Sequence, residues 1–482
     1  MELGWYRQDR AAVLAELARG EQPDLATTMA CGPLDELVAL HEELGQLAGL
    51  GELPIERERV GLPDPLLLRT LAALPFLSEA SLRGAAGALF REPALLLRLG
   101  WAPAQIRSGA NGRHRHPDGR QPESLPCHPE TLRDALQRVG AAAWDQAQRA
   151  GVRALYERGL IRGTVYAIDG SGLGPGLRLV SLICVSAERP IIVAWRLLAG
   201  TASEKGKEAS VTRALVEQAL ELGGPGCLEL LLADALYADG PLLAWLKHAK
   251  GIDALVRLPA DRRLYAEAHC ATHLDRTAWT RHQYVRTIRG HKELRTVEAT
   301  AATELRQWTS FAEAAATHGA AGATLWVALI RELVPTEQPA AEALALVSTR
   351  AWPSGFAAYQ AYRPRWHVEN DQFRELKEGW GLEQQRWGRA PDAVRGRIAL
   401  TCLAFNTAQL YRTRRGARLA ERAIRRLRRE HRPALGAAPV VIYLGGCYAV
   451  LALEELLAVL GRPVRESLLP SLSRPSHPRP PP

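Results

Sequence analysis

The feature that most constrains the fold is the order of elements between Thr164 and Leu258. Apolar and β-branched runs there predict three consecutive strands, followed by a helix, a strand, a helix and a strand. The predicted strands are Thr164–Ile168, Arg178–Ser186, Pro190–Leu197, Cys227–Ala233 and Asp253–Leu258, and the predicted helices are Glu208–Leu222 and Gly240–Lys250. This order predicts an α/β fold in which helices pack on a mixed sheet.

Two of these predicted strands end in an aspartate. Asp169 follows the first strand, and Asp234 follows the fourth. Either residue alone is equally well explained as a turn-former. A pair of carboxylates at strand ends, joined by a glutamate from a later helix, would repel one another unless a cation neutralised them. Mg²⁺ prefers such oxygen ligands, and two such ions can promote phosphodiester cleavage.

A later predicted helix, Tyr362–Lys377, supplies a candidate for that third carboxylate. Pro364 suits a first helical turn, because proline fixes φ and needs no backbone donor there. Arg365 and Glu369 are four residues apart, so they lie on one face of the helix. Taken alone, this segment is better explained as a solvated amphipathic helix with a surface ion pair.

The three carboxylates Asp169, Asp234 and Glu369 resemble the DDE triad of insertion-sequence transposases, which have a ribonuclease H-like core. One branch of that family places a β-rich insertion before the glutamate and has a signature of Tyr, two residues, Arg, three residues, Glu, six residues and Lys. Tyr362 and Arg365 stand at the family spacing from Glu369. Three further segments also resemble the family: Tyr166–Ser171, Trp195–Glu204 and Val256–Pro259.

The lysine of the signature is out of place. Lys377 lies eight residues after Glu369, whereas Leu376 occupies the family position. At about 100° per residue, eight residues overshoot the face of Glu369 by about 80°. We therefore expect Lys377 to reach the active face only if the helix is bulged or the side chain swings across it.

Two other acidic residues, Glu375 and Glu378, compete for the role of third carboxylate. The register of Tyr362 and Arg365 favours Glu369.

The resemblance also implies the chemistry. Two Mg²⁺ ions, with Mn²⁺ as a substitute, would be held by Asp169, Asp234 and Glu369, while Tyr362, Arg365 and Lys377 would contact DNA phosphates. The enzyme would hydrolyse a strand at each end of an element and join the freed 3′-hydroxyl to target DNA. Its partners would be double-stranded DNA and a second copy of the chain. Two rivals stay open: an inactive or repurposed DNA-binding relative, and a nuclease that cuts without joining.

The rest of the chain is assigned by composition and periodicity. Helical spacing predicts Arg10–Gly20, Leu34–Leu47, Ser78–Leu99, Thr131–Arg149 and Asp392–Tyr411, and short strands are predicted at Tyr284–Ile288, Arg295–Ala299, Thr324–Leu329 and Ala343–Ser348. In the insertion, Trp279 and Trp308 are candidates to stack on an extruded base, although core packing explains them more readily.

We therefore expect five regions: a helical, DNA-binding region 1–158; the first part of the catalytic core, 159–260; a β-rich insertion, 261–345; core helices carrying the signature, 346–411; and a basic C-terminal region with a proline-rich tail, 412–482.

Charge and apolar runs bear on partners and location. The formal charge is +9, and ten arginines fall within Arg412–Arg432, so a phosphate backbone is a natural partner. The first residues lack a signal-peptide pattern, and seven cysteines without a C-x-x-C pair indicate a reducing compartment. The apolar run Ala434–Leu453 approaches the length of a membrane span, but Pro439 and a Gly-Gly pair interrupt it. We interpret it as a strand Val440–Leu444, a turn and a helix from Tyr448, in a cytoplasmic, nucleoid-associated protein with no membrane contact.

Overall fold

The computed structural model describes residues 6–28, 34–57, 61–79, 81–108, 125–174, 176–199, 208–274, 279–288, 291–306, 308–333, 344–383, 387–415 and 439–460. They form two compact units. One is Tyr156–Arg374, and the other combines Met1–Leu155 with Glu375–Pro482. The predicted arginine-rich segment Arg412–Arg432 lies outside the described residues beyond Arg415, and the proline-rich tail lies wholly outside them.

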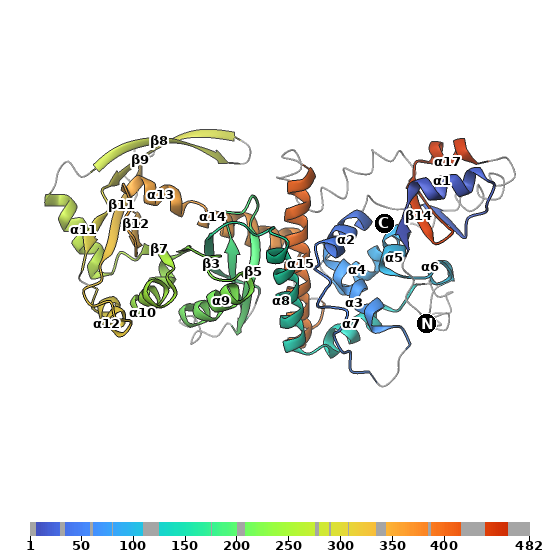
Figure 1. Ribbon diagram of the computed structural model, residues 1–482, viewed down its shortest axis with the longest axis horizontal. Helices are drawn as coiled ribbons and strands as arrows, with labels where there is room; N and C mark the ends of the chain where they lie inside the picture. Colours follow the sequence, from blue (N-terminus) through green and yellow to red (C-terminus); the bar gives the residue numbers. More distant parts are fainter. Residues whose placement is uncertain are drawn as a thin grey trace. The chain divides into compact units, whose positions relative to one another are not determined.

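The unit Tyr156–Arg374 is built on a ten-stranded mixed sheet (Figure 1). Its first five strands follow the predicted order: β3 (Val165–Gly172), β4 (Leu177–Cys184), β5 (Ile191–Ala199), β6 (Leu230–Ala233) and β7 (Asp253–Leu258). β3, β4 and β5 are antiparallel neighbours, whereas β6 and β7 run parallel to β3. The predicted mixed α/β architecture is therefore confirmed.

Helices join the parallel strands, as parallel connections require. α9 (Glu208–Gly223) connects β5 to β6 and packs on β4 and β5 through Leu215, Val216 and Ala219, which are buried. α10 (Gly240–Ala244) continues into η4 (Trp245–Ala249), a π-helical turn, before β7. These elements bury the apolar faces of the central strands, which are hydrophobic on both sides.

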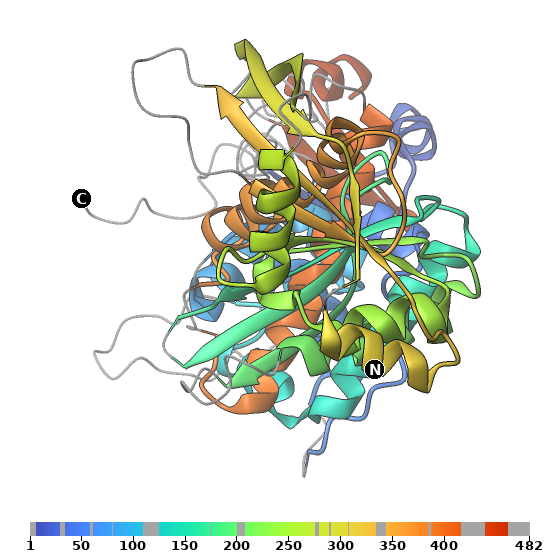
Figure 2. The same cartoon turned by 90° about the vertical axis from the view of Figure 1, so that its left-hand side faces the viewer.

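The strands of the predicted insertion extend this same sheet. β12 (Leu344–Ser348) pairs with β7, and β11 (Leu325–Leu333), β9 (His291–Thr300) and β8 (Trp279–Ile288) follow in that order, all antiparallel. The short strand β10 (Thr303–Leu305) pairs with β11 beside this path. Two helices, α11 (Arg263–Leu274) and α12 (Thr309–Thr317), accompany these strands. Seen from the side, the strands rotate progressively across the sheet, as the handed twist of β-structure dictates (Figure 2).

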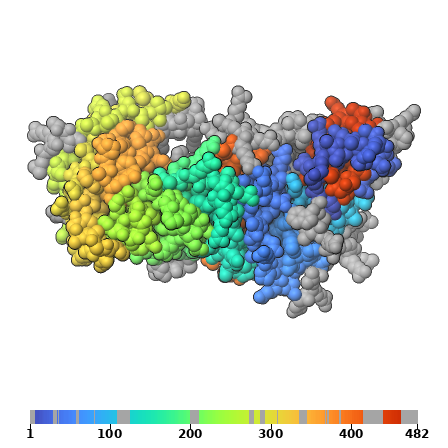
Figure 3. All heavy atoms as spheres, viewed as in Figure 1, coloured from blue at the N-terminus to red at the C-terminus, as the bar shows by residue number. Residues whose placement is uncertain are grey.

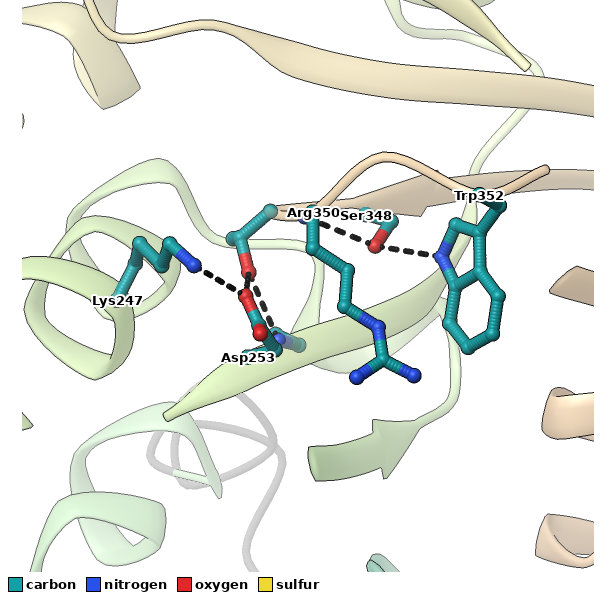
Figure 4. A network of polar contacts seen from close by, with 7 residues as sticks. Lys247, Asp253, Ser348, Arg350 and Trp352 are labelled. Atoms are coloured by element: carbon teal, nitrogen blue, oxygen red, sulfur yellow. Dashed lines mark hydrogen bonds and ion pairs between the residues drawn. The ribbon is translucent and has the colours of Figure 1, made fainter. Parts of the chain in front are cut away.

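A polar network fastens the added strands to the core (Figure 4). Asp253, at the start of β7, accepts hydrogen bonds from Lys247 Nζ at 2.7 Å and from Thr349 Oγ1 at 3.1 Å. Thr349, just beyond β12, accepts in turn from the backbone N–H of Ala254 at 2.9 Å. Because Thr349 Oγ1 is both donor and acceptor here, it ties the end of β12 to the beginning of β7.

The signature segment forms a series of short helices. α13 (Gly355–Tyr362) packs on β9 and β11, and it is followed by α14 (Arg365–His367) and the π-helix η5 (Val368–Phe373). Gly355 permits this packing, because a Cβ there would lie 2.2 Å from the carbonyl oxygen of Thr300. The second π-helix, η6 (Glu375–Gly379), begins the return of the chain to the other unit.

The second unit is largely helical. Its helices are α2 (Leu34–Glu43), α3 (Asp64–Ala73), α4 (Leu82–Leu89), α5 (Pro93–Leu99), α6 (Pro103–Ser108), α7 (Pro129–Arg138), α8 (Ala141–Glu157) and α15 (Pro391–Arg415), with the 3₁₀ turn η1 (Leu74–Leu77) after α3. α15 packs against α2, α3 and α7. The prediction of one helix over Ser78–Leu99 was wrong, because Ser81 caps α4 and Pro93 starts α5.

A small sheet in this unit joins segments from the two ends of the chain. Its order is β1 (Arg7–Gln8), β14 (Cys447–Leu451), β13 (Val440–Leu444) and β2 (Leu25–Thr28). α1 (Arg10–Ala18) and α17 (Leu453–Val459) cover it, so the N-terminal and C-terminal segments lie in contact (Figure 3).

The predicted strand Val440–Leu444 is confirmed, but the helix predicted from Tyr448 was wrong. Gly445 and Gly446 have φ values of 59° and 81°, which suits a tight turn that returns the chain as β14. Tyr448 is therefore a buried strand residue. Among the described helices, none is long and apolar enough to cross a membrane.

Candidate active site

Two aspartates lie side by side on neighbouring interior strands of the large sheet. β3 and β6 are parallel neighbours, and Ile168 pairs with Ala233 in their register. Asp169 and Asp234 are the next residues in this register, so they stand at the same level. Asp234 directly follows β6, but the prediction that Asp169 ends its strand was wrong, because β3 continues to Gly172 and stays paired with β4. Neighbouring strands are about 4.8 Å apart, which keeps two such carboxylates close together. The sheet register therefore brings together two residues that the sequence separates widely.

Each aspartate is oriented by the backbone that follows it. Asp169 Oδ1 accepts from the N–H of Gly170 at 2.7 Å, and Asp234 Oδ1 accepts from the N–H of Ala235 at 2.7 Å. Asp234 is also the N-cap of the 3₁₀ turn η3 (Ala235–Tyr237). The turn-forming role is therefore real for Asp234, and it leaves the second carboxylate oxygen for other partners.

Tyr362 contacts the strand residue that precedes Asp234. It is the last residue of α13, is 1% exposed, and donates through its hydroxyl to the carbonyl oxygen of Ala233 at 3.0 Å. Burial raises the pKa of Tyr362, and the nearby charges of Asp234 and Asp169 raise it further, whereas Arg365 and Arg257 oppose them. The hydroxyl therefore stays protonated and holds α13 against the residue that precedes Asp234.

Arg365 has a partner that the sequence did not predict. Its Nη1 atom lies 3.1 Å from Asp169 Oδ2, and the two side chains are only 7% and 14% exposed. Its guanidinium carbon also lies 5.6 Å from the centre of the Tyr362 ring. An arginine in this position neutralises one carboxylate of the pair and fixes its direction.

The remaining signature residues follow on the π-helices. Glu369 lies in η5, but its side chain is outside the described part of the chain. Lys377 lies in η6, in the largely helical unit, and is half-buried.

One competitor for the third carboxylate is already engaged within the helical unit. Glu375 accepts from Arg412 Nη1 at 2.9 Å and Nη2 at 2.5 Å, and from Trp380 Nε1 at 3.2 Å. Arg412 is 4% exposed and Glu375 is 17% exposed, so this pair is part of the interior. Glu378, the other competitor, is exposed. The geometry explains Glu375 as a structural residue.

Arg257 is a cation beside the pair that sequence reasoning did not single out. Ala233 pairs with Val256 in the parallel register of β6 and β7, so Arg257 lies next to Asp234. Its side chain is exposed, and its charge acts to lower the pKa of Tyr362. The sequence held a signal for it: Asp234 directly follows β6, and Arg257 is the second-last residue of β7, the next strand along the chain.

The tryptophans proposed for base stacking lie elsewhere in this unit. Trp279 is half-buried, and the guanidinium of Arg331 covers its ring at 3.8 Å. Trp308 is half-buried at the start of α12. One face of the Trp279 ring is therefore occupied by an arginine.

The donor set of the two aspartates fits a hard divalent cation. Asp169 and Asp234 present carboxylate oxygens, the ligands that Mg²⁺ and Mn²⁺ prefer. Within the described residues no group of three or more His, Cys, Asp or Glu side chains is placed to hold a metal ion, and the Glu369 side chain is not among the described residues. The two aspartates are therefore candidate ligands for such an ion.

Comparison with known families agrees with this geometry. Residues 189–407 match the family model described as a transposase DDE domain. The match spans less than half of the 482 residues and includes Asp234 and Glu369, whereas Asp169 lies 20 residues before it. No curated protein matches the chain.

Proposed function

We propose that this chain, a DDE-type transposase by its matched domain, binds the ends of an insertion sequence and catalyses metal-dependent strand cleavage and strand transfer. The family implies a DNA substrate. The observation that carries the proposal is the placement of Asp169 and Asp234 at the same level of parallel β3 and β6, with Tyr362 and Arg365 contacting them or their neighbours. Phosphoryl transfer needs little covalent chemistry from a protein and depends on such positioning and charge.

We further propose that the sheet order β5-β4-β3-β6-β7 is a ribonuclease H-like core. Three antiparallel strands are followed by two parallel ones, and β3 and β6 are the neighbours at which the pairing changes from antiparallel to parallel. In open α/β sheets, ligands bind outside the carboxyl ends of the parallel strands. Asp234 lies at the carboxyl end of β6, and Asp169 lies at the same level within β3.

Asp169, Asp234 and Glu369 are our proposed ligands for two Mg²⁺ ions, which Mn²⁺ could replace. Such ions, when bound, activate a nucleophilic oxygen and stabilise the leaving oxygen of a phosphodiester. Arg365 supports this role because its ion pair with Asp169 holds that carboxylate in one orientation. Tyr362 supports the same role because its hydroxyl donates to the carbonyl oxygen of Ala233, the residue before Asp234.

The same two signature residues, with Lys377, are our proposed contacts to DNA phosphates. Charged and hydroxyl groups of this kind set the register of a protein on DNA without reading its sequence. A π-helix has hydrogen bonds that span one residue more than those of an α-helix. Because η5 is such a helix, it can accommodate the extra residue between Glu369 and Lys377, which supports keeping Lys377 in the set.

We also propose that the chain acts as a homodimer on paired element ends, in the cytoplasm on nucleoid DNA. The formal charge of +9 supports DNA as the partner, since basic surfaces release counterions when they bind phosphates.

The direct test asks whether the protein cleaves the native DNA that flanks its own gene. A plasmid carrying the gene with its native flanking DNA is incubated with the protein and Mg²⁺ or Mn²⁺, and the strand breaks are mapped. We expect breaks at short inverted repeats that bracket the reading frame. Joining of the cleaved ends to a second plasmid would separate a transposase from a nuclease that only cuts.

The matched pair of variants is Asp234→Asn and Asp239→Asn. Asp239 also follows β6 and caps α10, accepting from the N–H of Leu242 at 2.8 Å, but it lies beyond η3. Removing a metal ligand should lower cleavage about a hundredfold or more with DNA binding retained, whereas Asp239→Asn should cleave like the wild type. Equal cleavage by Asp234→Asn and the wild type would refute the assignment of Asp234 as a metal ligand. DNA binding by the wild type without any cleavage would favour a repurposed relative.

A further inference from the structure

Three oxygen atoms meet between the β8–β9 hairpin and α13, away from the carboxylates. The hydroxyl of Tyr284, on β8, lies 2.9 Å from Glu332 Oε1, on β11. The hydroxyl of Tyr359, on α13, lies 3.0 Å from the same oxygen and 3.0 Å from the hydroxyl of Tyr284. The tyrosines are 7% and 1% exposed, so this cluster is largely shielded from water.

The chemistry of the cluster fixes its hydrogen-bond pattern. Each tyrosine has a single hydroxyl proton, and an ionised carboxylate can only accept. Burial raises the pKa of both Tyr284 and Tyr359, so both remain protonated. Both hydroxyls can therefore donate to Glu332, which makes this carboxylate the shared acceptor between one strand and one helix.

Other contacts from the hairpin follow the same face of α13. His282 stacks on Phe356 with ring centres 4.2 Å apart and planes at 1°. The guanidinium of Arg363 lies 4.3 Å from the centre of the Tyr284 ring. Phe356, Tyr359 and Arg363 are spaced by three and four residues, so they form one stripe along α13 and just beyond its end.

The C-terminal end of α13 lies at the candidate active site. Tyr362 follows Tyr359 by one helical turn and bonds to Ala233, and Arg365 comes three residues later and pairs with Asp169. A shift of α13 at Tyr359 would therefore move both groups. Displacements of about 1 Å in positioning groups can cost about a hundredfold in rate.

We infer that the Tyr284–Glu332–Tyr359 cluster is a positioning device, through which the β8–β9 hairpin holds α13 and so sets Tyr362 and Arg365 against β3 and β6 beside Asp169 and Asp234. The inference rests on the proposed function only for its catalytic consequence. Tyr284, Glu332 and Tyr359 touch neither carboxylate, and they act through α13.

The first test measures local opening, which needs no catalysis. Amide hydrogen exchange of residues 355–368 is compared between the wild type and the double variant Tyr284→Phe/Tyr359→Phe, with Tyr359→Phe alone as the milder change. The matched control is Tyr156→Phe. It also removes a hydrogen bond between two tyrosine hydroxyls in the same unit, the 2.7 Å contact between Tyr156 and Tyr166. We expect exchange in this segment to be about tenfold faster in the double variant and unchanged in the control. Unchanged exchange in the double variant would overturn the inference.

The second test measures cleavage of the plasmid described above at saturating DNA. We expect Tyr359→Phe to lower the rate constant about tenfold, with the DNA concentration at half-maximal rate within about twofold of the wild-type value. In an Arg365→Lys background the same change should have little further effect, because Tyr359 acts through Arg365. An equal loss of the rate constant in Tyr156→Phe would contradict the positioning role. So would a combined loss in Tyr359→Phe/Arg365→Lys that equals the product of the two single losses. If the wild type does not cleave, the proposed function fails, and hydrogen exchange alone decides this inference.

Discussion

The ion pair between Arg365 and Asp169 gives the most quantitative prediction. Replacing Arg365 with methionine keeps an unbranched side chain of similar length but removes the charge and breaks the ion pair with Asp169. Replacing Asp169 with asparagine removes the other charge of the same pair. The double variant removes both charges.

The structure sets the size of the effect. At the observed 3.1 Å, with an effective dielectric constant of about 20, the attraction is about 5 kcal/mol before desolvation. Desolvation of two side chains that are 7% and 14% exposed offsets much of it. Breaking a buried pair by removing one partner costs about 3–5 kcal/mol. Because Asp169 keeps its bond from the N–H of Gly170, we expect the lower end, about 3 kcal/mol, for Arg365→Met.

The assay is native-state hydrogen exchange of the amides of β3 and β6, because a two-unit chain need not unfold in one step. Both single variants should lower the opening free energy by about 3 kcal/mol, and the double variant should recover to within about 1 kcal/mol of the wild type. Losses below about 1 kcal/mol in the single variants would refute the reasoning. A double-variant loss equal to the sum of the single losses would refute it as well, because the two charges would then not be coupled.

Two further predictions concern packing and pH. Gly355→Ala should destabilise the α13 region by about 2 kcal/mol in the same exchange assay, because the added Cβ has no room. Gly87→Ala is the matched control in α4, where nothing lies within 4 Å of the added Cβ, and it should stabilise that helix by up to about 1 kcal/mol. Burial lowers the pKa of His41 to about 3, so the unfolded chain binds a proton there between about pH 6.5 and pH 3 that the folded chain does not. His41 should therefore cost the helical unit up to about 1.4 kcal/mol per pH unit as the pH falls through that window, and His41→Gln should show a shallower fall in urea unfolding. An equal slope in both proteins would contradict this assignment.

Local sequence signals predicted the core strands well. Apolar runs between Thr164 and Leu258 place β3 to β7 in the observed order along the chain, because strands that are buried on both faces are continuous hydrophobic segments bounded by turn residues. The same signals predicted Asp169 and Asp234 at strand ends, which is correct for Asp234, whereas β3 continues beyond Asp169 to Gly172. The helix boundaries around Ser78–Leu99 failed because caps and prolines interrupt an otherwise continuous apolar periodicity.

Long-range pairing was beyond the reach of those signals. The strands of the predicted insertion prolong the core sheet through β7 and β12, and β2 near the N-terminus pairs with β13 near the C-terminus. A strand pattern states which face is apolar but not which partner it takes. The segment from Tyr448 was ambiguous for the same reason, since a short apolar run suits a helix as well as a strand.

The sequence by itself determined the family resemblance, the succession of core strands along the chain and the candidate aspartates, because these depend on residue type and spacing along the chain. Only the tertiary structure decided which charges meet. It paired Arg365 with Asp169, put Arg257 beside Asp234 and engaged Glu375 with Arg412. Such pairs depend on the register between strands and on helix packing, which bring together residues too far apart in the chain for any local pattern to relate.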